Sequence, residues 1–428
     1  MSASVEAAIA ARRADTPERQ TAIARDRQDP LASYRAQFDL PQGEIYLDGN
    51  SLGAMPSSVK PAMAEALSQG WANELIRSWN GRGWHMLPVT VGDRLARLMG
   101  AKPGEVLAAD STSVNLYKVF SAAMRLRPGR TKVISEKNNF PTDVYILHGA
   151  ITNVFPDAEL LLAEDDDESV LSLLDTNTAV VCLSHVNYRT GRLRDMVRVT
   201  KAVQDAGGLV IWDLCHSLGA LPVDLNGCNA DFAVGCSYKY MNGGPGAPAS
   251  LFVAERHLHA VKNPLTGWQG HSTPFAFDIA FEQASSIEKF RVGTPPVLSY
   301  LPLLESLSIF EQTNIEALRE KSLALTDLFI ELSEKHLTRH GLTVITPKDH
   351  AVRGSQVALT HETGWPIMQA LIACGVVGDF RAPDILRFGF TPLYVGFEDV
   401  WGAVATLDAI MESGLWKEAR FAERKLVT

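Results

Sequence analysis

The chain has 428 residues, 46% hydrophobic and 21% charged, a balance too apolar for an intrinsically disordered protein. Its formal net charge of −9 argues against a general nucleic-acid binder, which usually carries a basic surface. No apolar run reaches the roughly 18 residues of a membrane helix, and the N-terminus lacks a signal-peptide core, so we expect a cytoplasmic protein.

The cysteine pattern predicts neither a structural zinc site nor a disulfide framework. The chain has five cysteines, and no two of them form a CxxC pair. In a reducing compartment, free thiols pack as small hydrophobic side chains. We therefore expect buried thiols and no metal site.

The first 60 residues predict a helical arm and a loop around the sequence YLDGNSLGAMP at 46–56. From about residue 105, apolar runs alternate with helical segments. The apolar runs predict strands at 105–110, 131–136, 158–163, 178–186, 208–215, 231–237 and 250–254. Helices are expected between them at 113–125, 141–149, 165–175 and 195–206. The pattern is typical of an α/β fold.

The strands are continuously apolar, which predicts a mostly parallel, doubly wound sheet covered by helices on both faces. After Pro302 the pattern changes to one long amphipathic helical stretch at 303–337. This stretch should lead into a smaller C-terminal α+β domain. The predicted organisation is an arm with an active-site loop at 1–60, a large α/β domain at 61–320 and a small domain at 321–428.

Polar side chains follow the apolar strands at the edge where a parallel sheet binds ligands. Lys239 follows one run and Asp213 lies near the end of another. A lysine in a desolvated pocket becomes an amine nucleophile that can form a Schiff base with an aldehyde. Asp213 can pair with a buried cation, such as the ring nitrogen of pyridoxal phosphate (PLP), or simply cap a helix. Because one more strand fits between them, both side chains should lie beside one ligand.

Hydroxyl groups gather where the helix at 113–125 begins. Ser111, Thr112 and Ser113, together with free backbone N–H groups, would suit a phosphate, although these residue types are also common helix caps. Phe140 follows another strand and can either lie flat on a cofactor ring or pack in the core.

Aromatic side chains also gather in the sequence SWNGRGWHMLP at 78–88. Trp79, Trp84 and His85 can form a wall for an aryl ketone or a buried aromatic cluster. His271 lies in a polar loop, where a histidine is more often only solvated, so we do not include it among the site residues.

Taken together, seven motifs resemble the kynureninase family, which consists of PLP-dependent enzymes of fold type I. The motifs are YLDGNSLG (46–53), FPTD (140–143), DLCHSLGALPVDL (213–225), CSYKYMNGGPG (236–246), GW (267–268), RVGTPPV (291–297) and LRFGFTPLY (386–394). The resemblance covers about residues 40 to 410. It implies hydrolysis of the Cβ–Cγ bond of L-kynurenine to anthranilate and L-alanine. The resemblance does not decide whether the 3-hydroxylated form of kynurenine is also a substrate.

The resemblance also implies which residues would bind PLP. Lys239 would carry the cofactor, Asp213 would pair with its ring nitrogen, and Tyr238 would border the cofactor and donate a proton late in the reaction. The other cofactor-binding residues would be Thr112, Ser113, Phe140, Asp143, Ser184, His216, Trp268 and Thr294.

By the same resemblance, Trp268 and Thr294 would reach the site from a second subunit, so a homodimer with a shared active site is expected. Arg387 would bind the α-carboxylate of the substrate, because a guanidinium binds a carboxylate through two parallel hydrogen bonds. Asn50 and Ser51 would line the substrate pocket.

Other functions remain open on the sequence. A cysteine desulfurase or an aminotransferase of the same fold is the nearest alternative. A desulfurase needs a mobile nucleophilic cysteine, whereas Cys374 is expected at a helix end. A nicotinamide-dependent oxidoreductase needs a G-x-G-x-x-G turn between a strand and a helix, whereas GGPG at 243–246 lies between two strands. A non-catalytic binding module would not need Lys239, Asp213 and Arg387 together.

Overall fold

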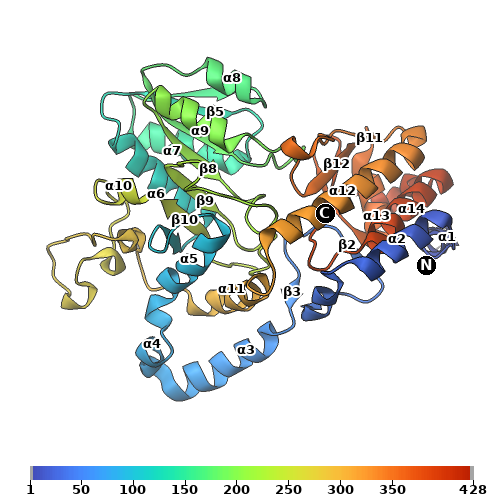
Figure 1. Ribbon diagram of the computed structural model, residues 1–428, viewed down its shortest axis with the longest axis horizontal. Helices are drawn as coiled ribbons and strands as arrows, with labels where there is room; N and C mark the ends of the chain where they lie inside the picture. Colours follow the sequence, from blue (N-terminus) through green and yellow to red (C-terminus); the bar gives the residue numbers. More distant parts are fainter. Residues whose placement is uncertain (1–2, 425–428) are drawn as a thin grey trace. The chain divides into compact units, whose positions relative to one another are not determined.

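The computed structural model describes residues 3–424, and the chain divides into two compact units (Figure 1). The first unit comprises Met1–Ser57, Arg189–Arg192 and Gln312–Thr428, and the second comprises Ser58–Tyr188 and Leu193–Glu311. The domain boundaries expected from the sequence stay a prediction.

The second unit is built on a seven-stranded sheet in the order β4-β10-β9-β8-β7-β5-β6. The strands are β4 (Val106–Ala108), β5 (Lys132–Glu136), β6 (Glu159–Ala163), β7 (Thr178–Ser184), β8 (Leu209–Asp213), β9 (Phe232–Gly235) and β10 (Ser250–Val253). Strands β5 to β9 pair in parallel, while β10 runs antiparallel to both β9 and β4. The predicted α/β fold with a mostly parallel sheet is confirmed.

Helices cover both faces of this sheet, as the side chains of β8 show. Ile211 belongs to one buried cluster with residues of α6 (Thr112–Arg125) and α7 (Pro141–Val154). The indole of Trp212 instead donates a hydrogen bond to Thr200 of α9 (Met196–Asp205) at 3.0 Å. Because successive side chains of a strand point to opposite faces, α6 and α7 lie on one face and α9 on the other.

The remaining helices of the second unit surround this core. They are α3 (Val59–Glu65), α4 (Ser78–Gly81), α5 (Leu87–Leu98), α8 (Asp167–Ser172), α10 (Glu255–Leu258) and α11 (Val297–Phe310). The predicted helix at 141–149 is longer in the structure, since α7 continues to Val154.

The single helical stretch predicted at 303–337 is wrong. Helix α11 begins before Pro302 and contains it, and the chain leaves helical geometry before α12 (Ile315–His336). Asn314 caps α12, because its side chain accepts a hydrogen bond from the Ala317 N–H at 2.7 Å. The apolar spacing continues across this break, so periodicity alone did not show it.

The first unit contains a four-stranded antiparallel sheet in the order β11-β12-β15-β14 and two smaller strand pairs, β1-β3 and β13-β2. The strands are β1 (Phe38–Asp39), β2 (Ile45–Tyr46), β3 (Met55–Pro56), β11 (Thr343–Val344), β12 (Gln356–Thr360), β13 (Val376–Val377), β14 (Asp379–Arg381) and β15 (Ile385–Gly389). Its helices besides α12 are α1 (Ala3–Ala11), α2 (Pro17–Gln28), α13 (Gly364–Ala373) and α14 (Phe397–Ser413).

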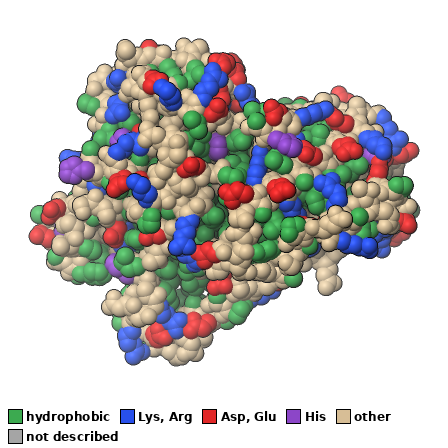
Figure 2. All heavy atoms as spheres, viewed as in Figure 1, with side chains coloured by type: hydrophobic (Ala, Val, Ile, Leu, Met, Phe, Trp, Pro, Cys, Tyr) green, Lys and Arg blue, Asp and Glu red, His purple; other side chains and the backbone are tan. Residues whose placement is uncertain are grey.

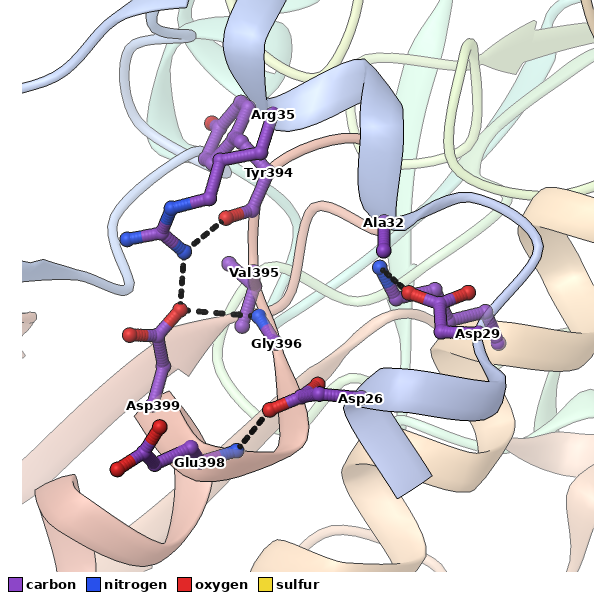
Figure 3. A pocket seen from close by; sticks show the side chains of 10 residues that line it. Asp26, Asp29, Ala32, Arg35, Tyr394, Val395, Gly396, Glu398 and Asp399 are labelled. Carbon is purple, nitrogen blue, oxygen red and sulfur yellow. Dashed lines mark hydrogen bonds and ion pairs between the residues drawn. The ribbon is translucent and has the colours of Figure 1, made fainter. Parts of the chain in front are cut away.

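The N-terminal arm caps helix α14 (Figure 3). The carboxylate of Asp26 in α2 accepts hydrogen bonds from the N–H groups of Phe397 at 2.6 Å and Glu398 at 2.8 Å. Asp399 accepts another from the Gly396 N–H at 2.9 Å and pairs with Arg35. Two carboxylates therefore satisfy N–H groups that a helix start leaves without intrahelical partners.

The surface carries charges of both signs. On the face in Figure 2, Lys and Arg side chains lie among Asp and Glu side chains. Among residues 3–424, no helix is both long and apolar enough to cross a membrane.

Candidate active site

A cavity of the second unit opens at the carboxyl ends of β7, β8 and β9, beside the starts of α6 and α7. It is lined by Ser111, Thr112, Ser113, Phe140, Thr142, Asp143, Ser184, Tyr188, Asp213, Cys215, His216, Tyr238 and Lys239. The structure thus brings together all the predicted cofactor-binding residues except Trp268 and Thr294. The sheet explains this, because its parallel strands end at one edge.

Lys239 lies half-buried in this cavity, in a compact turn after β9. The turn is closed by the Gly243 N–H, which donates to the Ser237 carbonyl at 2.9 Å. The Nζ atom of Lys239 lies 2.9 Å from Nε2 of His216 and 5.8 Å from the centre of the Phe140 ring. The amine therefore faces the cavity with a histidine within hydrogen-bond distance and an aromatic ring nearby.

Two carboxyl groups lie beside each other in the same cavity. Burial, followed by the negative charge of Asp213, raises the pKa of Asp143 well above its usual range. Asp213 ends β8, and one of its oxygens accepts a hydrogen bond from the Cys215 N–H at 2.7 Å. A positive charge placed against these carboxyl groups would relieve their mutual repulsion. The pair therefore suits a ligand with a cationic ring nitrogen.

The start of α6 forms the hydroxyl-rich side of the cavity. Ser111 is the N-cap, and its side chain accepts a hydrogen bond from the Val114 N–H at 3.4 Å. The preceding Asp110 has a positive φ of 48° and pairs with Lys118 of α6, which also donates to the Phe290 carbonyl at 2.7 Å. Hydroxyls and N–H groups at a helix start favour an anion such as phosphate.

The opposite side is organised around Asn139. Its side-chain oxygen accepts hydrogen bonds from the hydroxyl of Ser184 at 2.7 Å and from the N–H of Phe140 at 2.8 Å. The Phe140 ring meets Tyr188 edge to face, with ring centres 5.3 Å apart. Asn139 therefore fixes two predicted site residues at once.

Sequence reasoning missed several residues of this cavity and its supports. Tyr188 and Cys215 line it and follow strands β7 and β8, so their place after a strand was the available signal. Asn139 precedes the FPTD motif. Its role depends on a hydrogen bond to a residue 45 positions away, which no local pattern reveals.

A second polar cluster lies in the first unit around Arg387 of β15. Arg387 is buried, and its Nε donates to Asp379 of β14 at 2.8 Å. Another guanidinium nitrogen of Arg387 donates to the Ser51 hydroxyl at 2.9 Å. In the orientation that satisfies its neighbours, the Asn50 amide accepts from Arg387 at 3.0 Å and donates to Asp48 at 3.3 Å. The three predicted substrate-binding residues therefore lie together, held by two aspartates that the sequence did not single out.

Trp268 and Thr294 line a different cavity of the second unit. It is formed by Ile76, Trp79, Asn80, His85, Trp268, Gln269, Phe275 and Thr294. A further hollow is lined by Thr294, Trp79 and Trp84 together with Trp71 and Leu75. The predicted aromatic wall thus accompanies the two residues expected to act across a subunit interface. Burial, followed by the positive charge of Arg291, lowers the pKa of His85.

Solved structures show which fold this is. The chain resembles a cysteine desulfurase from Thermococcus onnurineus NA1, with a TM-score of 0.73 at 17% identity over 89% of this chain and 98% of the other. It also resembles the cystine C–S lyase C-DES, solved with its reaction product cysteine persulfide, with a TM-score of 0.74 at 15% identity over 86% and 98%. The fold is fold type I of the PLP-dependent enzymes.

The similarity to proteins of known sequence identifies the family within this fold. The chain is 50% identical to a kynureninase from Burkholderia pseudomallei (strain 1106a) over 96% of its length and 99% of that protein. It is 47% identical to a kynureninase from Pseudomonas fluorescens over the same shares. Residues 318–407 match the kynureninase C-terminal domain family. The chain belongs to the kynureninase family, and the resemblance noted from its motifs is confirmed.

Proposed function

We propose that this chain is a PLP-dependent hydrolase that cleaves the Cβ–Cγ bond of L-kynurenine to give anthranilate and L-alanine. The observation that carries the proposal is the cavity that brings Lys239, the Asp143–Asp213 pair and the start of α6 together. Relatives that share about half of the sequence are named for this activity.

The residues of the cavity fit PLP. Asp213 would face the ring nitrogen beside the buried Asp143, Phe140 would stack on the ring, and Thr112 and Ser113 would hold the phosphate. Ser184 and Tyr238 would complete the binding site around the cofactor. Bound PLP would supply an electron sink for the substrate carbon next to the amine. Asp213 would support this chemistry by favouring the protonated ring.

Lys239 is proposed to hold the cofactor and then to act as the base at the substrate Cα. His216, 2.9 Å from its Nζ, would orient the amine and exchange a proton with it. Burial raises the pKa of Tyr238, so its hydroxyl stays protonated at neutral pH. Tyr238 would therefore donate a proton to the substrate Cβ after the Cβ–Cγ bond has broken.

Arg387 is proposed to bind the α-carboxylate of the substrate. Its contacts with Asp379 and Ser51 fix the plane of the guanidinium, which lowers the entropy cost of binding. Asn50 would complete this end of the substrate site. The cysteine desulfurase alternative gains no support, because Cys374, the residue considered as its nucleophile, ends α13 and is fully buried.

The working enzyme is proposed to be a homodimer in which Trp268 and Thr294 complete the active site of the other subunit. Around these residues the second unit exposes large apolar side chains, among them Ile76, Phe275 and Phe277. Exposed apolar surface of this kind favours a protein partner. A cytoplasmic enzyme in tryptophan breakdown or NAD synthesis is the expected setting.

The test is replacement of Lys239 by Ala, with exposed Lys262 replaced by Ala as the matched control. Wild-type protein and the control should show a visible PLP absorbance that borohydride abolishes, and should release anthranilate and alanine. The Lys239→Ala variant should lose the borohydride-sensitive absorbance and at least a thousandfold in turnover. Unchanged anthranilate release would overturn the proposal. A keto acid, or sulfur released from cysteine, would indicate the alternative enzymes.

Preference between kynurenine and its 3-hydroxylated form is a separate measurement. A site built to bond one ring hydroxyl can discriminate by roughly 10⁴ or more. Kinetics with both substrates on the same protein would show which one the aromatic cavity favours.

A further inference from the structure

Two cysteines occupy neighbouring positions at the ends of β8 and β9. The register of these parallel strands pairs Asp213 with Val234, and Cys215 and Cys236 each lie two residues beyond that pair. Neighbouring strands are about 4.8 Å apart, and a disulfide needs a Cα separation of roughly 4.4 to 6.8 Å. Cys215 lies in the turn after β8, and the hydrogen bonds between the two residues show that they stay close beyond the paired strands.

The side chains face each other across this spacing. The Cys236 N–H donates a hydrogen bond to Sγ of Cys215 at 3.2 Å, and the Cys236 thiol donates to the Cys215 carbonyl at 3.7 Å. A hydrogen bond with Cys236, followed by burial, raises the pKa of Cys215. Burial opposes ionisation of Cys236, yet the contact with Cys215 and the charge of Lys239 lower its pKa overall.

The two thiols differ in access. Of the five cysteines, Cys215 is half-buried and the other four are buried. Cys215 lines the proposed cofactor cavity, where its sulfur lies 3.6 Å from the Thr112 hydroxyl. Cys236 lies behind it and is buried. A small oxidant can therefore reach Cys215 through the cavity, and Cys236 is close enough to react with the oxidised sulfur as the second thiol.

We propose that Cys215 and Cys236 form a reversible disulfide when the cavity holds no cofactor, and that this bond hinders cofactor binding. The Cys215 thiol passes its proton to the neighbouring Cys236, and the Cys215 sulfur attacks a hydroperoxide. The O–O bond breaks, the alkoxide takes the proton back from Cys236 and leaves as an alcohol, and Cys215 becomes a sulfenic acid. The Cys236 thiolate then attacks that sulfur and displaces hydroxide, which becomes water. Two thiols are oxidised while one hydroperoxide is reduced to an alcohol and water.

The disulfide acts on the cavity through two neighbours. Bonding to Cys236 turns the Cys215 sulfur away from Thr112, a proposed phosphate ligand, and removes the N–H···S contact at the end of β9. Lys239 follows Cys236 by three residues, so the disulfide would tie the segment that carries the proposed cofactor lysine to the residues that follow β8. Bound cofactor would cover Cys215, and this protection is the part that rests on the proposed function.

The experiment compares cofactor-free and PLP-loaded protein treated with tert-butyl hydroperoxide and then with a thiol-blocking reagent. Peptide mass mapping should find a Cys215–Cys236 cross-link in the cofactor-free protein. PLP, whose binding is checked by absorbance, should slow its formation at least tenfold. Oxidised protein should take up PLP at least tenfold more slowly, and dithiothreitol should restore uptake.

Cys215→Ser and Cys236→Ser should each abolish the cross-link, whereas Cys374→Ser, a matched buried cysteine elsewhere, should keep it. Oxidation that stops at sulfinic acid on Cys215 would overturn the proposal. So would a cross-link that leaves PLP uptake unchanged. A cross-link formed equally fast with PLP visibly bound would refute the protection. A protein that forms the cross-link but never binds PLP would instead contradict the proposed function.

Discussion

Asp110 holds a backbone conformation that side chains other than glycine rarely adopt. Its φ is 48°, and such a conformation costs about 1–2 kcal/mol in a residue without a polar side chain suited to it. Its carbonyl accepts a hydrogen bond from the Ala249 N–H at 3.0 Å, and its carboxylate pairs with the fully buried Lys118. These contacts hold the positive-φ conformation of Asp110 directly before the hydroxyl cluster of the proposed phosphate site.

We expect Asp110→Ala to be less stable than Asp110→Asn, because asparagine tolerates a positive φ and alanine does not. Both variants remove the charge partner of Lys118, but only asparagine can still accept a hydrogen bond from it, so their difference measures the backbone strain together with that hydrogen bond. Urea denaturation should place the alanine variant about 1 kcal/mol lower, and its affinity for PLP should also be lower. Equal stability would show that the backbone relaxes and that strain plays no part.

Asp48 should make the stability of the first unit depend on pH. Burial, followed by the negative charge of Asp379, raises the pKa of Asp48 to about 7, against about 3.9 in an unfolded chain. Between these values the folded protein binds more protons than the unfolded one. The contribution of Asp48 to the free energy of unfolding is therefore full below about pH 4 and is lost as the pH rises through about 7.

Asp48→Asn removes this titration, so its stability relative to wild type should rise between pH 5 and pH 8. For a partly exposed and screened group the change should be on the order of 1 kcal/mol. Chemical denaturation of both proteins at the two pH values measures it, and comparison with wild type cancels the other titrating groups. A difference that stays constant between pH 5 and pH 8 would mean that Asp48 is already ionised in the folded protein at pH 5.

At this scale the sequence predicted residues whose place follows from a strand end. Lys239 and Asp213 come after continuous apolar runs, and those runs became parallel strands that end at one edge. Asp379 and Asn139 were not predicted. Each depends on a contact with a residue on another element, Arg387 for Asp379 and Ser184 for Asn139, and such contacts exist only in three dimensions.

At the scale of elements, the cap that α2 provides to α14 should make a measurable contribution to the free energy of unfolding. Asp26 satisfies the N–H groups of Phe397 and Glu398 and lies near the positive end of the helix dipole. We expect Asp26→Ala to lower the free energy of unfolding by about 0.5–2 kcal/mol, the usual loss for a helix cap. Urea denaturation followed by circular dichroism measures this change.

The matched control is Asp15→Ala, which removes an exposed carboxylate of the same arm and should change stability by less than about 0.5 kcal/mol. If both variants lose the same amount, the arm as a whole, rather than the cap, is responsible. The arm was predicted as helical, but its function as a cap was not. The residues that it caps are more than 350 positions away.

Elements were predicted best where composition and periodicity agree. The strands of the parallel sheet are short, apolar and bounded by polar residues, so their positions followed from the sequence. The break between α11 and α12 did not, because apolar residues recur at helical spacing on both sides of it. The decisive feature there is the capping hydrogen bond of Asn314, which a periodicity argument does not weigh.

At the scale of the whole molecule, the proposed dimer predicts the effect of a charge in the apolar surface. Ile76 is 76% exposed and lines the hollow next to Thr294. Ile76→Asp should convert the dimer to a monomer in sedimentation and reduce turnover, because a buried charge without a partner disfavours association. Activity should recover partly at high protein concentration.

The control is Val197→Asp, since Val197 on α9 is 61% exposed and lies on a different helix of the second unit. This variant should keep the wild-type mass and activity. A wild-type protein that sediments as a monomer with full activity would refute the shared site. The cavity lined by Trp268 and Thr294 would then not be part of a subunit interface.

The placement of β10 governs when the cofactor site can come into existence during synthesis. Strand β4, which leads into the hydroxyl cluster, has β10 as its partner in the sheet, and the register joins Ala108 to Ser250. That contact closes a loop of about 140 residues, a slow step for a folding chain. During synthesis on the ribosome, the phosphate end of the pocket can therefore form only after the turn that carries Lys239 has emerged. We expect no partly formed site that could bind vitamin B6 before that point.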